Sequence, residues 1–291
     1  MSKNATKKIL LDHRLAPKKR FGQNFLVHRR TAEAIVACAE LNSGDTVIEV
    51  GVGLGALTTV LAEKVKNVIG IEIDSGIVRM HQEEKLLSDN VSLIHDDILA
   101  TDFEELVQRS GGPLKIMANL PYSISNPFIF KLVENRQYLD WAVVMLQKEV
   151  AQRLMAKPAT KEYGIPTVLL GACARIQKIK TLKPHEFHPQ PKVDSVVVRI
   201  DFSAGRHIHG RLSTPNFNML QKVVRACFSK RRKTLLNNLA SASMWSGSAE
   251  EKPSREDITA AIHDAGLSAE IRAETMTLQQ FAALADTINK M

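Results

Sequence analysis

Residues 119–122, Asn-Leu-Pro-Tyr, follow an apolar run and combine three groups that suit a planar amine. The side-chain oxygen of Asn119 can accept one N–H, and a main-chain carbonyl at Leu120 or Pro121 can accept the other, because proline fixes the backbone direction. Tyr122 offers a flat ring for stacking a base, a contact worth ~1–3 kcal/mol. Held in this way, the exocyclic amine of adenine could aim its lone pair at a methyl carbon without a metal or a general base. Taken alone, the segment is more often a β-turn with a buried tyrosine.

A glycine-rich segment, EVGVGLGALT, occupies residues 49–58. Gly51, Gly53 and Ala56 match the pattern G-x-G-x-x-G/A, in which the backbone approaches a ligand closely. Glu72 ends the next apolar run, at the spacing from the glycines where a carboxylate can accept hydrogen bonds from both ribose hydroxyls. These residues predict an adenosine-containing ligand. A dinucleotide would place its pyrophosphate at the helix N-terminus, whereas S-adenosylmethionine has no phosphate.

Two adjacent acids, Asp96 and Asp97, end the third apolar run. A carboxylate at this position can accept a hydrogen bond from the amino group of an adenine ring that lies against the sheet. Side chains alternate along a strand, so only one of the two acids would point toward the ligand. Taken alone, each is more often a solvated loop acid.

Short apolar runs alternate with helical patterns up to about residue 203, which predicts an α/β domain with a parallel sheet covered on both faces. The expected strands are residues 45–51, 67–74, 91–98, 114–120 and 194–202, with 174–182 as an edge partner and with 141–150 as a strand that runs into a helix. Ligands bind beyond the carboxyl ends of the strands in such sheets. The candidate residues, which follow four of these strands, would therefore meet at one edge.

The pattern after residue 203 is helical, so we predict two domains. Residues 1–203 would form the α/β domain with a basic N-terminal arm, and residues 204–291 a small all-helical domain. Within the second, Ser254 is a candidate helix start, and Thr277 with Gln280 resembles a capping box.

The positive charge is concentrated at the N-terminus. The 291-residue chain has a net charge of +8, and residues 1–30 alone carry nine Lys or Arg against the single acid Asp12. These basic residues are Lys3, Lys7, Lys8, Arg14, Lys18, Lys19, Arg20, Arg29 and Arg30. Such an arm suits a polyanion, and equally a solvated terminus.

Few features of the sequence indicate a cellular compartment. No apolar run approaches the ~18 residues of a membrane span, and the start shows no signal-peptide pattern. Cys38, Cys173 and Cys227 are far apart and odd in number, which favours free thiols over a disulfide framework or a metal site. We therefore expect a cytoplasmic protein without a membrane segment.

The motifs together make the chain similar to the ribosomal RNA adenine dimethyltransferases, which modify two adjacent adenosines near the 3′ end of small-subunit rRNA. The resemblance covers most of the chain. It is carried by RFGQNFL (20–26), EVGVGLGALT (49–58), IEID (71–74), HDDIL (95–99), NLPYSIS (119–125), LQKEVAQRL (146–154), FHPQPKVDSVVV (187–198) and CFSKRRKTLLNNL (227–239).

The resemblance implies a Rossmann-like methyltransferase sheet and S-adenosylmethionine as methyl donor, with no metal. It assigns the cofactor contacts to Asn24, Leu26, Gly51, Glu72, Asp97 and Asn119. It also suggests that Phe187 closes over the flipped base opposite Tyr122. Val52 departs from the family, which often has proline or glycine there, but this position presents mainly backbone.

The resemblance also gives the basic segments a role. Arg225, the run Lys230, Arg231, Arg232 and Lys233, and the N-terminal lysines could bind rRNA phosphates, with affinity that falls as salt rises. Without the resemblance, the run is equally well explained as a solvated helix end.

We therefore expect a monomeric enzyme that transfers two methyl groups to N6 of each of two neighbouring adenines in 16S rRNA within the 30S subunit or its precursor. Three alternatives remain. A large-subunit rRNA adenine N6-methyltransferase is disfavoured by the FHPQPKVDS and FSKRRKTL segments. An NAD-dependent oxidoreductase has no use for Asn119 to Tyr122. A catalytically silent assembly or transcription factor does not need an intact Asn119 and Tyr122.

Overall fold

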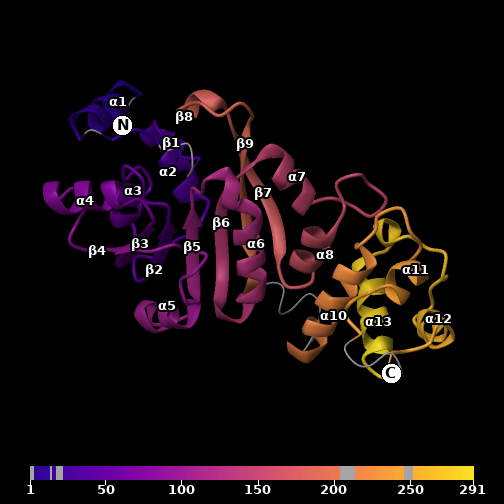
Figure 1. Ribbon diagram of the computed structural model, residues 1–291. Helices are drawn as coiled ribbons and strands as arrows, with labels where there is room; N and C mark the ends of the chain where they lie inside the picture. Colours follow the sequence, from indigo (N-terminus) through magenta and orange to yellow (C-terminus); the bar gives the residue numbers. More distant parts are fainter. Residues whose placement is uncertain (1–2, 14, 18–21, 204–213, 246–251) are drawn as a thin grey trace. The chain divides into compact units, whose positions relative to one another are not determined.

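The computed structural model describes residues 3–13, 15–17, 22–203, 214–245 and 252–291 (Figure 1). The chain divides into two compact units. The first comprises Met1–Ala151 and Arg175–Ser203, and the second comprises Gln152–Ala174 and Ala204–Met291. Four residues of the predicted basic arm, Arg14, Lys18, Lys19 and Arg20, lie outside the described residues.

The first unit is built on a seven-stranded sheet in the order β4-β3-β2-β5-β6-β9-β7. Its strands are β2 (Thr46–Val50), β3 (Asn67–Glu72), β4 (Val91–His95), β5 (Leu114–Ala118), β6 (Leu139–Gln147), β7 (Arg175–Leu182) and β9 (Ser195–Asp201). The pairs from β4 to β6 are parallel, which confirms the predicted Rossmann-like α/β class. The predicted strands are present, with 174–182 at the edge.

The last two strands depart from the predicted parallel arrangement. β9 pairs antiparallel with both β6 and β7. A parallel return needs a crossover connection, usually an α-helix. The short connection between Leu182 and Ser195 contains no α-helix, so β9 runs back antiparallel beside β7.

Five helices connect the strands and flank the sheet in Figure 1. They are α2 (Arg29–Ala37), α3 (Thr58–Ala62), α4 (Ser75–Glu84), α5 (Phe103–Ser110) and α6 (Ser125–Glu134). Two begin at aspartate caps: Asp74 accepts from the Gly76 N–H, and Asp102 accepts from the Glu104 N–H. Single 3₁₀ turns occur at η2 (Tyr122–Ile124), η3 (Arg136–Tyr138) and η4 (Pro184–Glu186).

The N-terminal segment contains a helix that was not predicted, α1 (Lys3–Asp12). Its Leu10 belongs to a small buried cluster with Phe25 and Leu54. A two-stranded antiparallel sheet follows, in which β1 (Phe25–Leu26) pairs with β8 (Phe187–His188). The register places Leu26 opposite Phe187, so two segments far apart in the sequence meet beside the glycine-rich loop.

The second unit is helical, as the sequence predicts for the C-terminal part. It contains α8 (Ile165–Gly171), α10 (Thr214–Cys227), α11 (Leu235–Ala240), α12 (Arg255–Asp264), η6 (Ala273–Thr275) and α13 (Leu278–Ile288). Ser254 caps α12, and Thr277 with Gln280 forms the capping box of α13, which confirms both predicted helix starts. The buried Phe281 stacks on the half-buried Phe228, with ring centroids 5.7 Å apart.

Residues 152–174 differ from the predicted domain boundary. The sequence placed them in the first domain, but they group with the helical unit. This segment includes the end of α7 (Lys148–Leu154) and all of α8. The Tyr163 hydroxyl donates to the Met276 carbonyl at 2.8 Å, and α8 packs against α10, so buried contacts rather than chain order assign the segment.

None of the helices in the described part of the chain is both long and apolar enough to cross a membrane.

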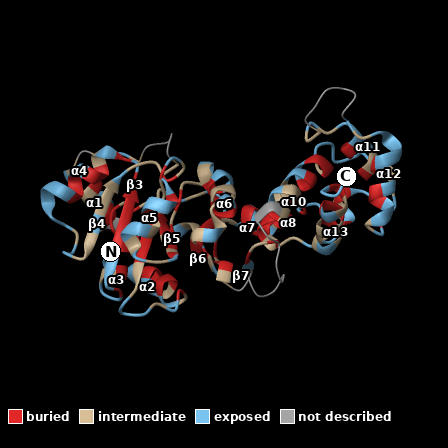
Figure 2. Cartoon of the chain, turned by 90° about the horizontal axis from the view of Figure 1, so that it is seen from below, coloured by how far each residue is buried: buried red, intermediate tan, exposed pale blue. Residues whose placement is uncertain are grey.

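Figure 2 shows buried residues concentrated along the strands and on the inner faces of the helices. One of them is an acid: Glu49 on β2 is 1% exposed, and neither carboxylate oxygen has a hydrogen-bond partner among the described residues. Burial raises the pKa of Glu49 to about 8, and the neighbouring Glu72 charge adds to the rise. Glu49 is therefore largely neutral in the folded protein at pH 7.

This shift makes stability depend on pH. The unfolded chain releases the Glu49 proton near pH 4.5, whereas the folded chain retains it up to about pH 8. The free energy of unfolding should therefore fall between these values, by at most about 1.4 kcal/mol per pH unit. Glu49→Gln, which stays neutral, should remove this contribution. The free energy of unfolding of the variant should therefore increase relative to that of the wild type as pH rises from 5 to 8. Urea unfolding across this range measures the difference, and parallel profiles for the two proteins would contradict the assignment.

Candidate active site

The glycine-rich loop runs from the end of β2 to the start of α3. Gly51 and Gly53 have φ of +80° and +54°, which side chains rarely adopt. A Cβ on Gly51 would lie 2.9 Å from the Asn119 carbonyl oxygen, and one on Gly53 would lie 3.1 Å from the Phe25 ring. The glycines therefore let the ends of β2 and β5 and the β1 segment approach one another closely.

Glu72, at the end of β3, fixes the shape of this loop. Its Oε2 accepts the Gly53 N–H and its Oε1 accepts the Asp74 N–H, both at 2.9 Å. Its side chain is nearly buried, and burial raises the pKa of Glu72. Because each carboxylate oxygen has two lone pairs, Glu72 can still accept from two ligand hydroxyls.

His81 on α4 holds the next peptide group, through the carbonyl of the same Gly53, a role that sequence reasoning missed. Its Nε2 lies 2.7 Å from the Gly53 carbonyl oxygen. A carbonyl can only accept, so Nε2 carries the hydrogen. Burial lowers the pKa of His81, which keeps the ring neutral. A lone histidine on the apolar face of a helix offers no signal of this role in one sequence.

The structure separates the roles of Asp96 and Asp97. Both carboxylate oxygens of Asp96 are engaged: Oδ1 accepts the Asp97 N–H at 2.8 Å, and Oδ2 accepts the Thr101 hydroxyl at 2.7 Å. Asp97 accepts the Leu99 N–H with Oδ1, while its Oδ2 accepts no hydrogen bond from the described residues. Asp97 therefore has the acceptor that a ligand could use.

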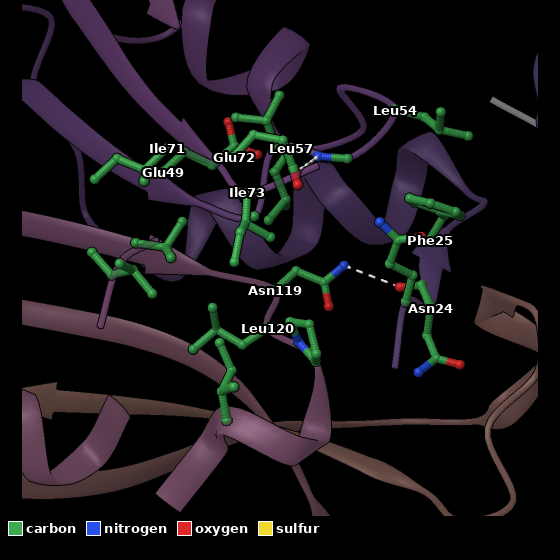
Figure 3. A pocket seen from close by; sticks show the side chains of 18 of the residues that line it. Asn24, Phe25, Glu49, Leu54, Leu57, Ile71, Glu72, Ile73, Asn119 and Leu120 are labelled. Carbon is green, nitrogen blue, oxygen red and sulfur yellow. Dashed lines mark hydrogen bonds between the residues drawn. The ribbon is translucent and has the colours of Figure 1, made fainter. Parts of the chain in front are cut away.

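Asn119 follows β5, and the hydrogen bond of its amide defines its orientation (Figure 3). Its Nδ2 donates to the Asn24 carbonyl at 3.3 Å, which leaves Oδ1 as an acceptor without a partner among the described residues. The Pro121 carbonyl accepts the Ile124 N–H at 3.1 Å, whereas the Leu120 carbonyl accepts none from the described residues. Two acceptors, Asn119 Oδ1 and Leu120 O, are thus left at adjacent positions.

These groups line one pocket that is partly open to solvent. Eight predicted residues lie on its wall: Asn24, Leu26, Gly51, Glu72, Asp97, Asn119, Leu120 and Pro121. Glu49 also lines it, although both of its carboxylate oxygens are buried. Gly51 and Gly53, the remaining acceptors of Glu72 and the free Oδ2 of Asp97 fit an adenosine with an attached chain. They offer no side-chain cation to a pyrophosphate.

Tyr122 and Phe187 do not line this pocket. The Tyr122 hydroxyl lies 2.6 Å from Oγ of Ser195, which is fully buried at the start of β9. Burial raises the pKa of Tyr122. Phe187 is 1% exposed and packs in the core with Leu26, so a stacking role would require its ring to move. Ser195 lies in the motif FHPQPKVDSVVV, but sequence reasoning gave it no role.

Among the described residues, no group of three or more His, Cys, Asp or Glu side chains is placed to hold a metal ion. Apart from the N-terminal lysines, the predicted RNA-binding residues lie in the helical unit. Arg225 is exposed on α10, and the run from Lys230 to Lys233 lies in the exposed turn between α10 and α11. We call residues 229–234 the basic turn. Arg231 differs from its neighbours, because it forms an ion pair with Glu274 at 2.8 Å.

Comparison with known proteins identifies the family. The family model described as ribosomal RNA adenine dimethylase matches residues 14–285. The ribosomal RNA small subunit methyltransferase A of Desulfotalea psychrophila is 52% identical over 282 residues, which are 96% of this chain and 94% of that protein.

Two crystal structures are similar over most of the chain. A dimethyladenosine transferase from Plasmodium falciparum has a TM-score of 0.75 and 27% identity, and the match covers 91% of this chain and 98% of that one. The 23S rRNA methyltransferase ErmE has a TM-score of 0.64 and 22% identity over 91% of this chain and 100% of that one, which is a likeness of fold. The chain belongs to the ribosomal RNA adenine dimethylase family.

Proposed function

We propose that this protein transfers methyl groups from S-adenosylmethionine to N6 of two adjacent adenosines in the 3′-terminal hairpin loop of 16S rRNA, giving N6,N6-dimethyladenosines. The small-subunit assignment is supported by the 52% identical relative, which is named a small subunit methyltransferase. The observation that carries the chemistry is the orientation of Asn119. Its amide donates to Asn24, so its oxygen is available at the edge of the sheet where Glu72 and Asp97 also end.

The cofactor would lie across the carboxyl ends of the first strands. Glu72 would accept from the ribose hydroxyls and Asp97 from the adenine amino group, while Gly51, Asn24 and Leu26 would enclose the remainder. When bound, S-adenosylmethionine supplies a methyl group on a positively charged sulfur. The closely packed glycine loop leaves room for this part of the molecule and presents no Cβ to it.

The target adenine would be held by its amine. Asn119 Oδ1 accepts one N–H and the Leu120 carbonyl accepts the other, which directs the nitrogen lone pair at the methyl carbon. S-adenosylmethionine would supply the methyl group, with its S–C bond exchanged for the new N–C bond, and the amine would release a proton to solvent. Positioning of this kind recovers on the order of 7–11 kcal/mol of the barrier. Tyr122 would supply a stacking surface, with its hydroxyl anchored by Ser195.

The alternative functions explain fewer features of the site. An NAD-dependent oxidoreductase leaves the acceptors at Asn119 and Leu120 without a use. A large-subunit methyltransferase would share the fold of ErmE, but the 22% identity carries no argument about substrate. We also propose that the protein acts as a monomer in the cytoplasm on the 30S subunit or its precursor.

Replacing Glu72 should weaken cofactor binding. Glu72→Ala removes two charge-assisted hydrogen bonds to the ribose, each worth roughly 1.5–3 kcal/mol, so affinity should fall at least about tenfold. Titration calorimetry with S-adenosylmethionine measures the change. Glu83→Ala, which removes an exposed acid from α4, is the control. Wild-type cofactor affinity in the Glu72 variant would count against the ribose assignment.

Asn119→Ala should abolish methyl transfer, because the amine loses the acceptor that orients its lone pair. Binding to undermethylated 30S particles should stay within about threefold, since one neutral hydrogen bond is worth only ~0.5–1.5 kcal/mol. Transfer of labelled methyl groups and particle binding are measured in parallel. Asn126→Ala, at an exposed position of α6, is the matched control. If the two measurements fall together, Asn119 acts in RNA binding rather than in transfer.

Loss of the Tyr122–Ser195 hydrogen bond should slow methyl transfer and leave the affinity for the cofactor unchanged. Ser195→Ala and Tyr122→Phe each remove the same bond, so each should slow transfer by roughly 5–10-fold, or ~1–1.5 kcal/mol. The double variant should be no worse than either single one. Single-turnover rates and cofactor titrations distinguish these effects. Additive losses in the double variant would show that the two side chains act independently.

A further inference from the structure

The basic turn is held from inside the helical unit by Asn238, which is 1% exposed on α11. Its Nδ2 donates to the carbonyls of Cys227 at 2.6 Å and Lys230 at 3.1 Å. Its Oδ1 accepts from the Ser229 hydroxyl at 3.1 Å and the Lys230 N–H at 3.2 Å. A side chain that uses all four of its hydrogen-bonding positions fixes the turn, so its exposed cations need little ordering before they bind a ligand.

Arg231 points back to the protein, unlike its neighbours. Its Nε donates to Glu274 Oε2 at 2.8 Å, and its terminal amino group lies 3.5 Å from the Thr160 carbonyl oxygen. The Glu274 carbonyl in turn accepts the Ala159 N–H at 2.7 Å. Glu274 therefore joins the basic turn to the loop between α7 and α8, which lies much earlier in the chain.

The α7–α8 loop is also well fixed. The Thr160 hydroxyl donates to the Lys157 carbonyl at 2.7 Å, and Tyr163 anchors the end of the loop through its bond to Met276. Two cations of this loop, Lys157 and Lys161, are exposed. They form no ion pair with the described residues, and the same holds for Lys230, Arg232 and Lys233 of the basic turn. Glu162 is an exposed acid beside them.

We propose that Lys157 and Lys161 join Lys230, Arg232 and Lys233 in one surface that binds the phosphate backbone of RNA, and that Arg231 joins the two segments rather than contacting phosphate. This rests on the proposed action on rRNA. We call these five residues the composite basic surface. RNA suits it better than a lipid membrane, because none of the exposed large apolar side chains of the described residues lies in either segment.

The first test removes the two lysines that the sequence did not single out. Lys157→Gln with Lys161→Gln should lower affinity for undermethylated 30S particles about 30-fold at 0.1 M salt. It should also reduce the slope of log affinity against log salt by about 1.5, since each lost phosphate contact contributes roughly 0.7–0.9. Lys230→Gln with Lys233→Gln should behave alike. The control pair, Lys64→Gln with Lys66→Gln, removes two exposed lysines from the turn before β3, at the amino ends of the strands.

The second test asks what Arg231 does. Glu274→Ala removes an acid, so affinity for the particle should rise if Arg231 is a phosphate ligand restrained by Glu274. If Arg231 joins the two segments, the loop and the turn lose their connection and affinity should fall about fivefold or more, with the circular dichroism of the helices unchanged. A rise in affinity would overturn the role assigned to Arg231.

The experiments distinguish an error in the composite basic surface from an error in the proposed function. A wild-type protein that neither binds nor methylates 30S particles would refute the proposed function itself. A wild-type protein that does both, with a Lys157/Lys161 variant identical to the Lys64/Lys66 control, would refute only the composite basic surface. Binding to phosphatidylglycerol vesicles with the same dependence on Lys157 and Lys161 would assign the surface to a membrane instead.

Discussion

The backbone of Gly53 is the part of the loop on which the geometry of the site depends. Glu72 accepts the Gly53 N–H and His81 donates to the Gly53 carbonyl, so the two peptide groups on either side of this residue are held between the end of β3 and the last turn of α4. Three glycines with positive φ stand at alternate positions of this loop. Such a loop would otherwise have many conformations, since glycine loses more conformational freedom on folding than any other residue. The two hydrogen bonds select one of them. The same carboxylate that would bind the ribose therefore also shapes the loop beside it.

A second constraint connects this loop to the target side of the pocket. Gly51 packs directly on the Asn119 carbonyl, and the Asn119 side chain in turn donates to the backbone of Asn24. The end of strand β5, the glycine loop and the β1 segment are thus held together by close backbone packing and by one side-chain-to-backbone hydrogen bond. Such contacts have a narrow range of distances, which suits a reaction in which nitrogen and carbon must be aligned.

The sequence predicted the parts of the site that depend on the backbone pattern, and missed those that depend on tertiary contacts. The glycines after β2, the acid at the end of β3 and the Asn-x-Pro-Tyr segment after β5 can be placed from the order of the strands alone, because each stands at the carboxyl end of a strand. His81 and Ser195 act through single contacts with Gly53 and Tyr122, and nothing in their neighbours along the chain indicates these partners.

The same reason explains where the predictions differ from the structure. A list of basic residues does not reveal that Arg231 is paired with Glu274, because the acid lies in a distant part of the sequence. Chain order likewise suggested that residues 152–174 belong with the sheet, whereas Tyr163 and α8 are buried against the later helices. The pairing of β8 with β1 buries the ring of Phe187 beside Leu26, and its expected place over the target base stays a prediction.

Dimethylation sets a further demand that this arrangement can meet. After a first methyl transfer the adenine amine keeps a single N–H, so in the proposed arrangement only one of the acceptors at Asn119 Oδ1 and Leu120 O would be used in the second transfer. An amide held only by its substrate would then be free to turn. Here the Asn119 Nδ2 donates to Asn24, a bond that does not involve the substrate. Under the proposed function, the amide would therefore keep its orientation through both transfers, and the loss of one N–H would cost the protein no internal hydrogen bond.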